Sequence, residues 1–186
     1  MLPDRLAIKG RGRVETRLVL AKEAVADCQV LAILAAFSPE IVSTIYVGFD
    51  TPDSDIDIVC SCSDAGAFER VFSRAYASCD GYVFTQRDDY AVGRFRWRDF
   101  MFEVFVAGTP VTEQLGYRHF KLMQRLSRIG GERFRQRVRA LKLSGLKTEP
   151  ALCALLGLPG DPYQAVLVVE TWSDREILDM IDAHLV

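Results

Sequence analysis

Four aspartates fall within eight residues of one short segment of the chain. The segment is Tyr46–Cys62, YVGFDTPDSDIDIVCSC, and the acids are Asp50, Asp53, Asp55 and Asp57. Carboxylates packed this closely repel one another, so the cluster is unfavourable unless an opposite charge relieves it. Carboxylate oxygens are ligands that suit Mg²⁺ and Mn²⁺. The segment is therefore a candidate binding site for a divalent cation.

Two of these acids belong to a predicted strand over residues 55–60. Side chains alternate along a strand, so Asp55 and Asp57 share one face and the intervening isoleucines point into a core. The two Cα atoms are separated by about 6.6 Å, and carboxylates this close can bind one divalent ion or a pair of ions. Asp50 and Asp53 are more typical of turn residues, so a purely structural acidic turn is an alternative.

A third acid lies in the later apolar segment FMFEVFVAG, where Glu103 follows Phe102 and precedes Val104. A charged side chain in an apolar strand is costly unless it is paired or bound to metal. Taken alone, Glu103 is more typical of the exposed face of a half-solvated strand. The presence of Asp55 and Asp57 in the same sheet favours Glu103 as a third metal ligand.

The order of these residues resembles the polymerase β-type nucleotidyltransferase superfamily over roughly residues 41–106. The resemblance comprises Gly48, a turn, the strand start Asp55-Ile56-Asp57-Ile58 and the later Glu103. It implies that Asp55, Asp57 and Glu103 are catalytic acids that hold Mg²⁺ or Mn²⁺. The metal would position a nucleoside triphosphate for transfer of a nucleotidyl group to an acceptor, which is a small molecule, an RNA or a protein.

The superfamily carries a serine after the glycine, and that serine contacts a phosphate. In this sequence Phe49 follows Gly48 instead. Gly48, Thr51 and Ser54 are the candidate substrate-binding residues of the turn, with Thr51 or Ser54 replacing the missing hydroxyl. The departure leaves an alternative function open, a catalytically inactive nucleotide-sensing or protein-interaction module on the same fold.

A second resemblance covers more of the chain and rests on three segments in order, YVGFDTPDSDIDIV, GYRHF and LKLSGLKTEPALCALLGLPGDPY. They are similar to an uncharacterised bacterial family known as a domain of unknown function (DUF4269-like), a distant relative of the nucleotidyltransferases. In this sequence the GLKTEPA and GDPY segments are also explained as helix starts, with Thr148 and Asp161 as N-caps. We expect that structural explanation to be the correct one.

Ten Lys or Arg and one acid, Glu132, lie between Arg118 and Lys147. Such a basic helical segment either faces phosphates or forms a solvated helix face. Arg118 and Lys142 are the candidates for contact with a phosphate, Lys142 because related enzymes often carry such a lysine on a helix after the sheet. His119 on the same helix is more typical of a hydrogen-bonded structural residue than of a catalytic base. Three arginines alternate along the strand before Glu103 and share one face: Arg94, Arg96 and Arg98. They either line a cleft or solvate an edge strand, which such charges protect from aggregation.

The elements that must position these residues indicate an α+β fold, in which helices cover one face of a small mixed or antiparallel sheet of about five strands. We expect a nucleotidyltransferase-like core over residues 1–110 and a helical region over 111–186 that packs on it as a single compact unit. The predicted strands are 41–47, 55–60, 82–86, 90–97 and 100–106, and the last three form a meander. The predicted helices are 16–37, 64–77, 112–128, 132–143, 149–156, 162–171 and 174–183.

The whole chain has 186 residues, a formal net charge of −2 and five cysteines. An odd number of cysteines without a secretory signal argues against a disulfide framework, and the N-terminal MLPDRLAIKGRGR has no apolar signal core. No window is apolar enough to cross a bilayer. We therefore expect a cytoplasmic protein with no membrane partner, and the family resemblance implies a bacterial one.

Overall fold

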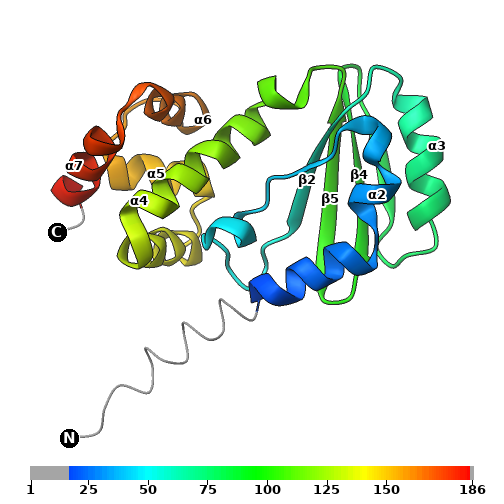
Figure 1. Ribbon diagram of the computed structural model, residues 1–186, viewed down its shortest axis with the longest axis horizontal. Coiled ribbons are helices and arrows are strands. Elements are labelled where there is room, and N and C mark those ends of the chain that lie inside the picture. Colours follow the sequence, from blue (N-terminus) through cyan, green and yellow to red (C-terminus); the bar gives the residue numbers. More distant parts are fainter. Residues whose placement is uncertain (1–16, 185–186) are drawn as a thin grey trace, which may run out of the picture. The chain divides into compact units, whose positions relative to one another are not determined.

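A computed structural model describes residues 17–184, which fall into two compact units (Figure 1). The first unit comprises the described residues up to Tyr46 together with Asp55–Val111. The second comprises Val47–Ser54 together with the described residues from Thr112 onward. The chain passes between the units three times, because the turn before Asp55 belongs to the second unit. Over residues 17–184, no helix is both long and apolar enough to span a membrane.

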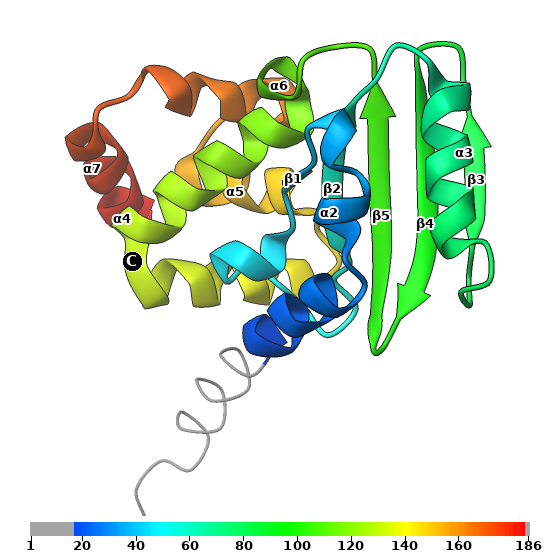
Figure 2. The same ribbon diagram turned by 45° about the vertical axis from the view of Figure 1, so that its right-hand side comes forward.

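The first unit contains a five-stranded mixed sheet, as the sequence predicts (Figure 2). Its strands lie in the spatial order β1 (Glu40–Ile41), β2 (Ile56–Ser61), β5 (Phe100–Ala107), β4 (Tyr90–Trp97) and β3 (Val83–Gln86). The pair β2 and β5 is parallel, and the other three pairs are antiparallel. The predicted meander of the last three strands is confirmed.

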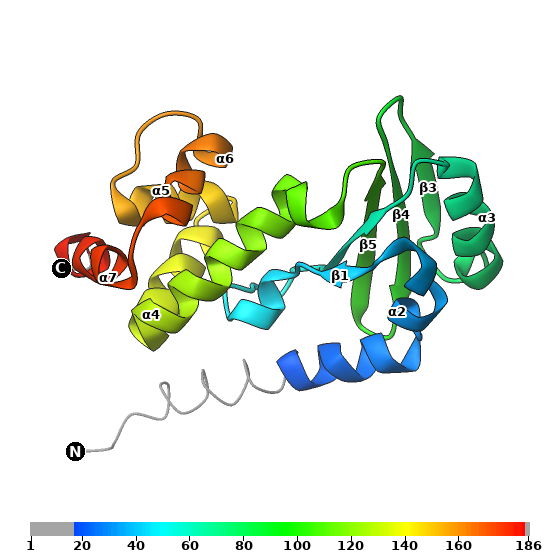
Figure 3. The ribbon, with the colours of Figure 1, turned by 45° about the horizontal axis from the view of Figure 1, so that its top comes forward.

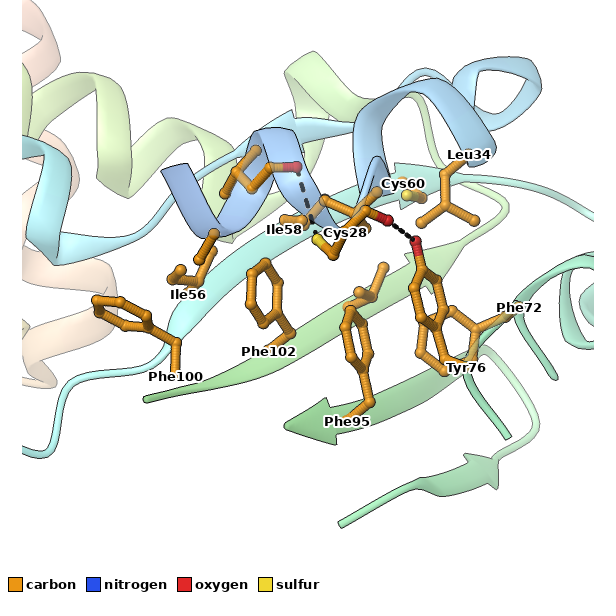
Figure 4. Packing of buried hydrophobic residues seen from close by; sticks show 14 of the residues in the cluster. Cys28, Leu34, Ile56, Ile58, Cys60, Phe72, Tyr76, Phe95, Phe100 and Phe102 are labelled. Atoms are coloured by element: carbon orange, nitrogen blue, oxygen red, sulfur yellow. Dashed lines mark hydrogen bonds between the residues drawn. The ribbon is translucent and has the colours of Figure 1, made fainter. Parts of the chain in front are cut away.

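Helices cover one face of this sheet. They are residues 17–27, α2 (Val30–Ile33), a 3₁₀ turn (Ala35–Phe37) and α3 (Ala65–Tyr76). Their buried side chains form one core with the strands, which Figure 4 shows from close by. In that core the Tyr76 ring stacks on Phe95 with 4.0 Å between centroids, and its hydroxyl donates to the Cys28 carbonyl at 3.0 Å. Burial raises the pKa of the thiols of Cys28 and Cys60 to about 11 and about 12.

The second unit is helical (Figure 3). Its helices are α4 (Leu115–Leu143), α5 (Thr148–Leu156), α6 (Pro162–Ala165), the 3₁₀ segment Val166–Thr171 and α7 (Asp174–His184), and a 3₁₀ turn, Val111–Glu113, lies at the boundary. The long helix α4 packs against α5 and α7. Gly131 has φ 63° and ψ −160°, which interrupts α4 near the predicted break between two helices. Asp161 caps α6 by accepting from the amides of Tyr163 and Gln164, as predicted.

The strand predicted over residues 41–47 is wrong beyond its first residue. Strand β1 ends at Ile41, and Thr44–Val47 forms a 3₁₀ turn. The cause is Ser43, whose hydroxyl donates to the Asp55 carbonyl at 2.7 Å and accepts from the Ile45 amide at 3.3 Å. These side-chain bonds satisfy the backbone locally and override the β-propensity of the β-branched residues.

Three further predictions need correction. The single helix predicted over residues 16–37 breaks at Gln29, whose φ of 54° is left-handed. Its predicted start at residue 16 lies outside the described residues. The N-terminal segment that was considered for a signal also lies outside them. The N-cap of α5 is Lys147 rather than Thr148, which is the first helical residue. Arg98 leaves the predicted arginine ladder because β4 ends at Trp97, and Arg98 pairs with Asp27 at 3.1 Å.

Candidate functional site

Asp57, Glu103 and Arg94 form a row across three neighbouring strands of the first unit. Asp57 on β2 is the register partner of Glu103 on β5, and Glu103 is the register partner of Arg94 on β4. Register partners project to the same face of a sheet. The alternate residues Ile56 and Phe102 are fully buried in the helix-covered core, so the row lies on the other face. We call this second face the polar face.

The backbone around the two aspartates is held from the side of β1. The Ser43 hydroxyl donates to the carbonyl of Asp55, and the amide of Val42 donates to the carbonyl of Asp57 at 2.9 Å. Asp55 directly precedes β2, which begins at Ile56. The bonds hold the backbone at both aspartates, but the strand predicted over residues 55–60 begins one residue later, so a shared face for Asp55 and Asp57 stays a prediction.

The Glu103 carboxylate is paired with a cation from its own sheet. Arg94 Nε donates to Glu103 Oε2 at 2.7 Å, and a terminal guanidinium nitrogen of Arg94 lies 2.6 Å from the same oxygen. Within residues 17–184 no group of three or more His, Cys, Asp or Glu side chains is arranged to hold a metal ion. The structure thus brings Glu103 beside Asp57, and it also shows a partner, Arg94, that sequence reasoning did not assign. The signal was the arginine ladder, whose partner depends on strand register.

The turn Val47–Ser54 is bound to helix α4 through three consecutive backbone carbonyls. Each accepts a hydrogen bond from a side chain of α4. The bonds are Ser127 Oγ to Val47 O at 2.7 Å, an Arg139 guanidinium nitrogen to Gly48 O at 2.6 Å, and Lys142 Nζ to Phe49 O at 2.7 Å. The backbone of this part of the turn is therefore held by the helical unit, and two of the three donors are cationic.

The surroundings of Gly48 and Phe49 explain why those residue types occur in the turn. Gly48 has φ 72°, and a Cβ at this position would lie 2.7 Å from Cδ of Arg135, so only glycine fits without displacement. Phe49 is fully buried and packs edge-on against Phe134, with 6.0 Å between ring centroids. The resemblance predicts a phosphate-binding serine at this position, and in the structure Phe49 is a buried hydrophobic anchor.

Thr51 and Ser54, the other candidates of the turn, bond to each other. The Thr51 amide donates to Ser54 Oγ at 2.9 Å, and the two hydroxyl oxygens are 3.3 Å apart. The Ser54 amide in turn donates to the Thr51 carbonyl at 3.1 Å. Both residues thus have a turn-forming function, and contact of either hydroxyl with a phosphate stays a prediction.

Most of the basic residues of α4 are paired within the second unit. Arg118, a predicted phosphate contact, donates two bonds to Glu170 at 3.0 and 2.7 Å, and this pairing holds the pKa of Glu170 below its ordinary value. Asp174 accepts from two further arginines of α4, and Glu132 accepts from two more. These pairs are Arg125 and Arg128 with Asp174, and Arg135 and Arg139 with Glu132. Much of the charge of the basic segment therefore stabilises the helical unit.

His119 lies buried between α5 and α6. Its Nδ1 is 3.2 Å from Glu149 Oε1, and its Nε2 is 2.8 Å from the Tyr163 carbonyl oxygen. Both partners are acceptors, so both ring nitrogens must carry protons to satisfy them. Burial alone would lower the pKa of His119, but the bonds with Glu149 and Tyr163 outweigh burial and raise it. This arrangement agrees with a structural function.

Comparison with solved structures identifies the class of fold. The structure resembles the Cid1 poly(U) polymerase, reported with MgGTP bound, at a TM-score of 0.53 and 14% sequence identity over 81% of this chain. It also matches the polymerase core of TRAMP, an RNA surveillance complex, at a TM-score of 0.45 and 14% identity over 90% of the chain. The chain spans 48% and 57% of those two proteins. The likeness to the Cid1 poly(U) polymerase shows that the fold is nucleotidyltransferase-like.

The sequence itself defines the family. Residues 23–169 match the family described as a domain of unknown function, DUF4269, and the chain belongs to that family. No curated protein sequence matches the chain.

Proposed function

We propose that the protein is a metal-dependent nucleotidyltransferase, which transfers a nucleotidyl group from a nucleoside triphosphate to an acceptor. The observation that carries this proposal is the placement of Asp57 and Glu103 as register partners on adjacent parallel strands, with Asp55 directly before the first of these strands. Neighbouring strands are about 4.8 Å apart, so the two carboxylates begin from closely spaced backbones. The nucleotidyltransferase-like fold supports the same proposal.

The residue types of this acidic group suit a hard divalent cation, because all of them offer carboxylate oxygens, and binding would require their side chains to turn toward a common ion. Asp55 and Asp57 would hold Mg²⁺ or Mn²⁺, and Glu103 would lie beside them. A bound cation would supply neutralisation of phosphate charge and orientation of the triphosphate. The protein's own residues contribute a fixed backbone at Asp55 and Asp57 and a core that keeps the strand in place.

The proposal is tested by calorimetric titration of the protein with Mn²⁺ and each nucleoside triphosphate. We expect binding in the presence of Mn²⁺ and a loss of at least tenfold in affinity for Asp57→Asn. The matched control is Asp53→Asn, an exposed aspartate of the same segment, which should bind as the unmodified chain does. Equal affinities for the unmodified chain and Asp57→Asn would contradict the proposal.

A second candidate function is a catalytically inactive nucleotide-sensing or protein-interaction module. It is favoured by the ion pair of Glu103 with Arg94 and by the burial of Phe49 where a phosphate-binding serine would be expected. This candidate predicts nucleotide binding without turnover. Product formation from any triphosphate in a panel of acceptors, lost on Glu103→Gln, would reject it in favour of the enzyme.

A further inference from the structure

We propose that the second unit binds the phosphodiester backbone of a single-stranded nucleic acid in a basic groove along α4. The groove has a volume of about 480 Å³. Glu170 of the 3₁₀ segment Val166–Thr171 lines it, and four of the other lining residues are cations of α4: Arg118, Lys121, Arg125 and Arg128. We call it the α4 groove. It is formed by residues of the second unit alone, so it is separate from the acids of the first unit.

The four cations of the α4 groove form one row because of their spacing. Successive members are three, four and three residues apart, so they share one face of the helix. The row extends from Arg118 to Arg128, which is about 15 Å along the helix axis. A single small anion covers only part of such a row, whereas a chain of phosphates contacts several of its members.

Carboxylates hold three of the four cations in place. Glu170 accepts from Arg118 with both of its oxygens, at 3.0 and 2.7 Å. Asp174 accepts from Arg125 with one oxygen at 2.8 Å and from Arg128 with the other at 2.7 Å. A guanidinium has five N–H donors, so Arg118 and Arg128 keep donors for a second anion while their positions are fixed.

Positive charge remains in excess after this pairing. The row carries four positive charges, and Glu170 and Asp174 supply two negative ones, so two positive charges are left over. Among residues 17–184 no carboxylate pairs with Lys121, which is exposed and whose ammonium lies 6.0 Å from the centre of the Tyr117 ring. A hollow with a net positive charge attracts the phosphates of a nucleic acid.

The shape and lining of the α4 groove favour a single strand that is bound without regard to its bases. A duplex is read by an element that projects into one of its own grooves, whereas these cations line a hollow of the protein, which suits one strand. None of the described residues that line the hollow is aromatic, so the bases have no ring on which to stack. Binding should therefore depend on phosphate charge and weaken with salt.

The test is a fluorescence anisotropy titration of the full chain with a labelled single-stranded RNA at several salt concentrations, without a nucleoside triphosphate or a divalent metal. A second arm uses single-stranded DNA of the same sequence, and a third uses duplex DNA. We expect the logarithm of the association constant to fall against the logarithm of the salt concentration with a slope of about −1.4 to −2.1, which corresponds to two or three phosphates.

Variants of the two exposed cations of the row locate the binding site. Lys121→Met and Arg128→Met should each weaken binding about fivefold and bring the slope about 0.7 closer to zero. Lys121→Arg keeps the charge and should bind as the unmodified chain does. The matched control is Arg137→Met, which removes an exposed arginine of α4 that does not line the groove and should leave binding unchanged. Circular dichroism establishes that each variant is folded.

Binding of RNA alone, of DNA alone or of both supports the inference and identifies the source of the backbone. The inference is overturned by a lack of binding to both single strands, by a duplex that binds as tightly as they do, or by an Arg137→Met loss as large as that of Lys121→Met. Since the titration contains neither a triphosphate nor a metal, this inference and the proposed function succeed or fail independently.

Discussion

Phe49 and Phe134 pack edge-to-face in the helical unit, with both side chains fully buried and their ring centroids 6.0 Å apart. The contact joins the turn that precedes the acidic strand to the second half of α4. The position at which the sequence resemblance predicts a phosphate-binding serine is thus part of a hydrophobic core. The turn is held by the side chain of Phe49 as well as by the backbone carbonyls of Val47, Gly48 and Phe49.

Restoring the serine should therefore destabilise the protein. We expect Phe49→Ser to lower the free energy of unfolding by about 3–5 kcal/mol, because it empties a buried aromatic site. Phe49→Leu, which keeps much of the apolar volume, should cost clearly less. Chemical denaturation followed by circular dichroism measures both. A cost below about 1 kcal/mol for Phe49→Ser would show that Phe49 is not an anchor.

Lys142 should contribute to stability through its bond to the Phe49 carbonyl. Hydrogen bonds from charged groups contribute about 1.5–3 kcal/mol, so Lys142→Met should lower the free energy of unfolding by that amount. Lys121→Met, on an exposed position of the same helix, is the control and should change stability little. Unchanged stability of Lys142→Met together with weaker nucleotide binding would instead favour the phosphate contact predicted from sequence.

The pH dependence of stability should report the charged state of His119. Its pKa is raised above 6.5 in the folded protein, since its bonds with Glu149 and Tyr163 outweigh burial. A group with a raised pKa contributes its full stabilisation below the unfolded pKa and loses it as the pH rises through the folded pKa. We expect the free energy of unfolding, measured by denaturation between pH 6 and 8, to fall as the pH rises.

The matched variants for this effect are His119→Phe and Glu149→Gln. His119→Phe should cost about 3–5 kcal/mol at pH 6, since it leaves the buried Glu149 carboxylate without its cation. Both variants should also flatten the pH dependence between pH 6 and 8. If the pH dependence of the free energy of unfolding persists in His119→Phe, other groups cause it.

Gly93 should be intolerant of any side chain. It lies in β4 beneath α3, and a Cβ at this position would overlap Cε1 and Cζ of the Phe72 ring. Phe72 is itself fully buried, so the clash cannot be relieved by rotation toward solvent. We expect Gly93→Ala to cost about 1–3 kcal/mol in denaturation experiments. The double variant Gly93→Ala with Phe72→Leu should cost less than the sum of the single changes.

Much of the fold follows from local sequence patterns. Alternation between Asp55 and Ile58 places isoleucines in the core, and the strands and turns from Val83 to Ala107 lie close to their predicted ranges. Asp161 and Pro162 start a helix as their residue types require. These predictions succeed because they depend on residues a few positions apart, whose geometry the backbone sets by itself.

The partners of the predicted site residues were decided by tertiary structure. The sequence by itself determined the types and order of the acids, the cations and the strands that carry them. The pairing of Glu103 with Arg94 depends on strand register, and the bond of Lys142 to the carbonyl of Phe49 joins residues 93 positions apart. A buried aromatic or an ion pair forms only when distant segments meet, so periodicity along the chain could not assign those partners.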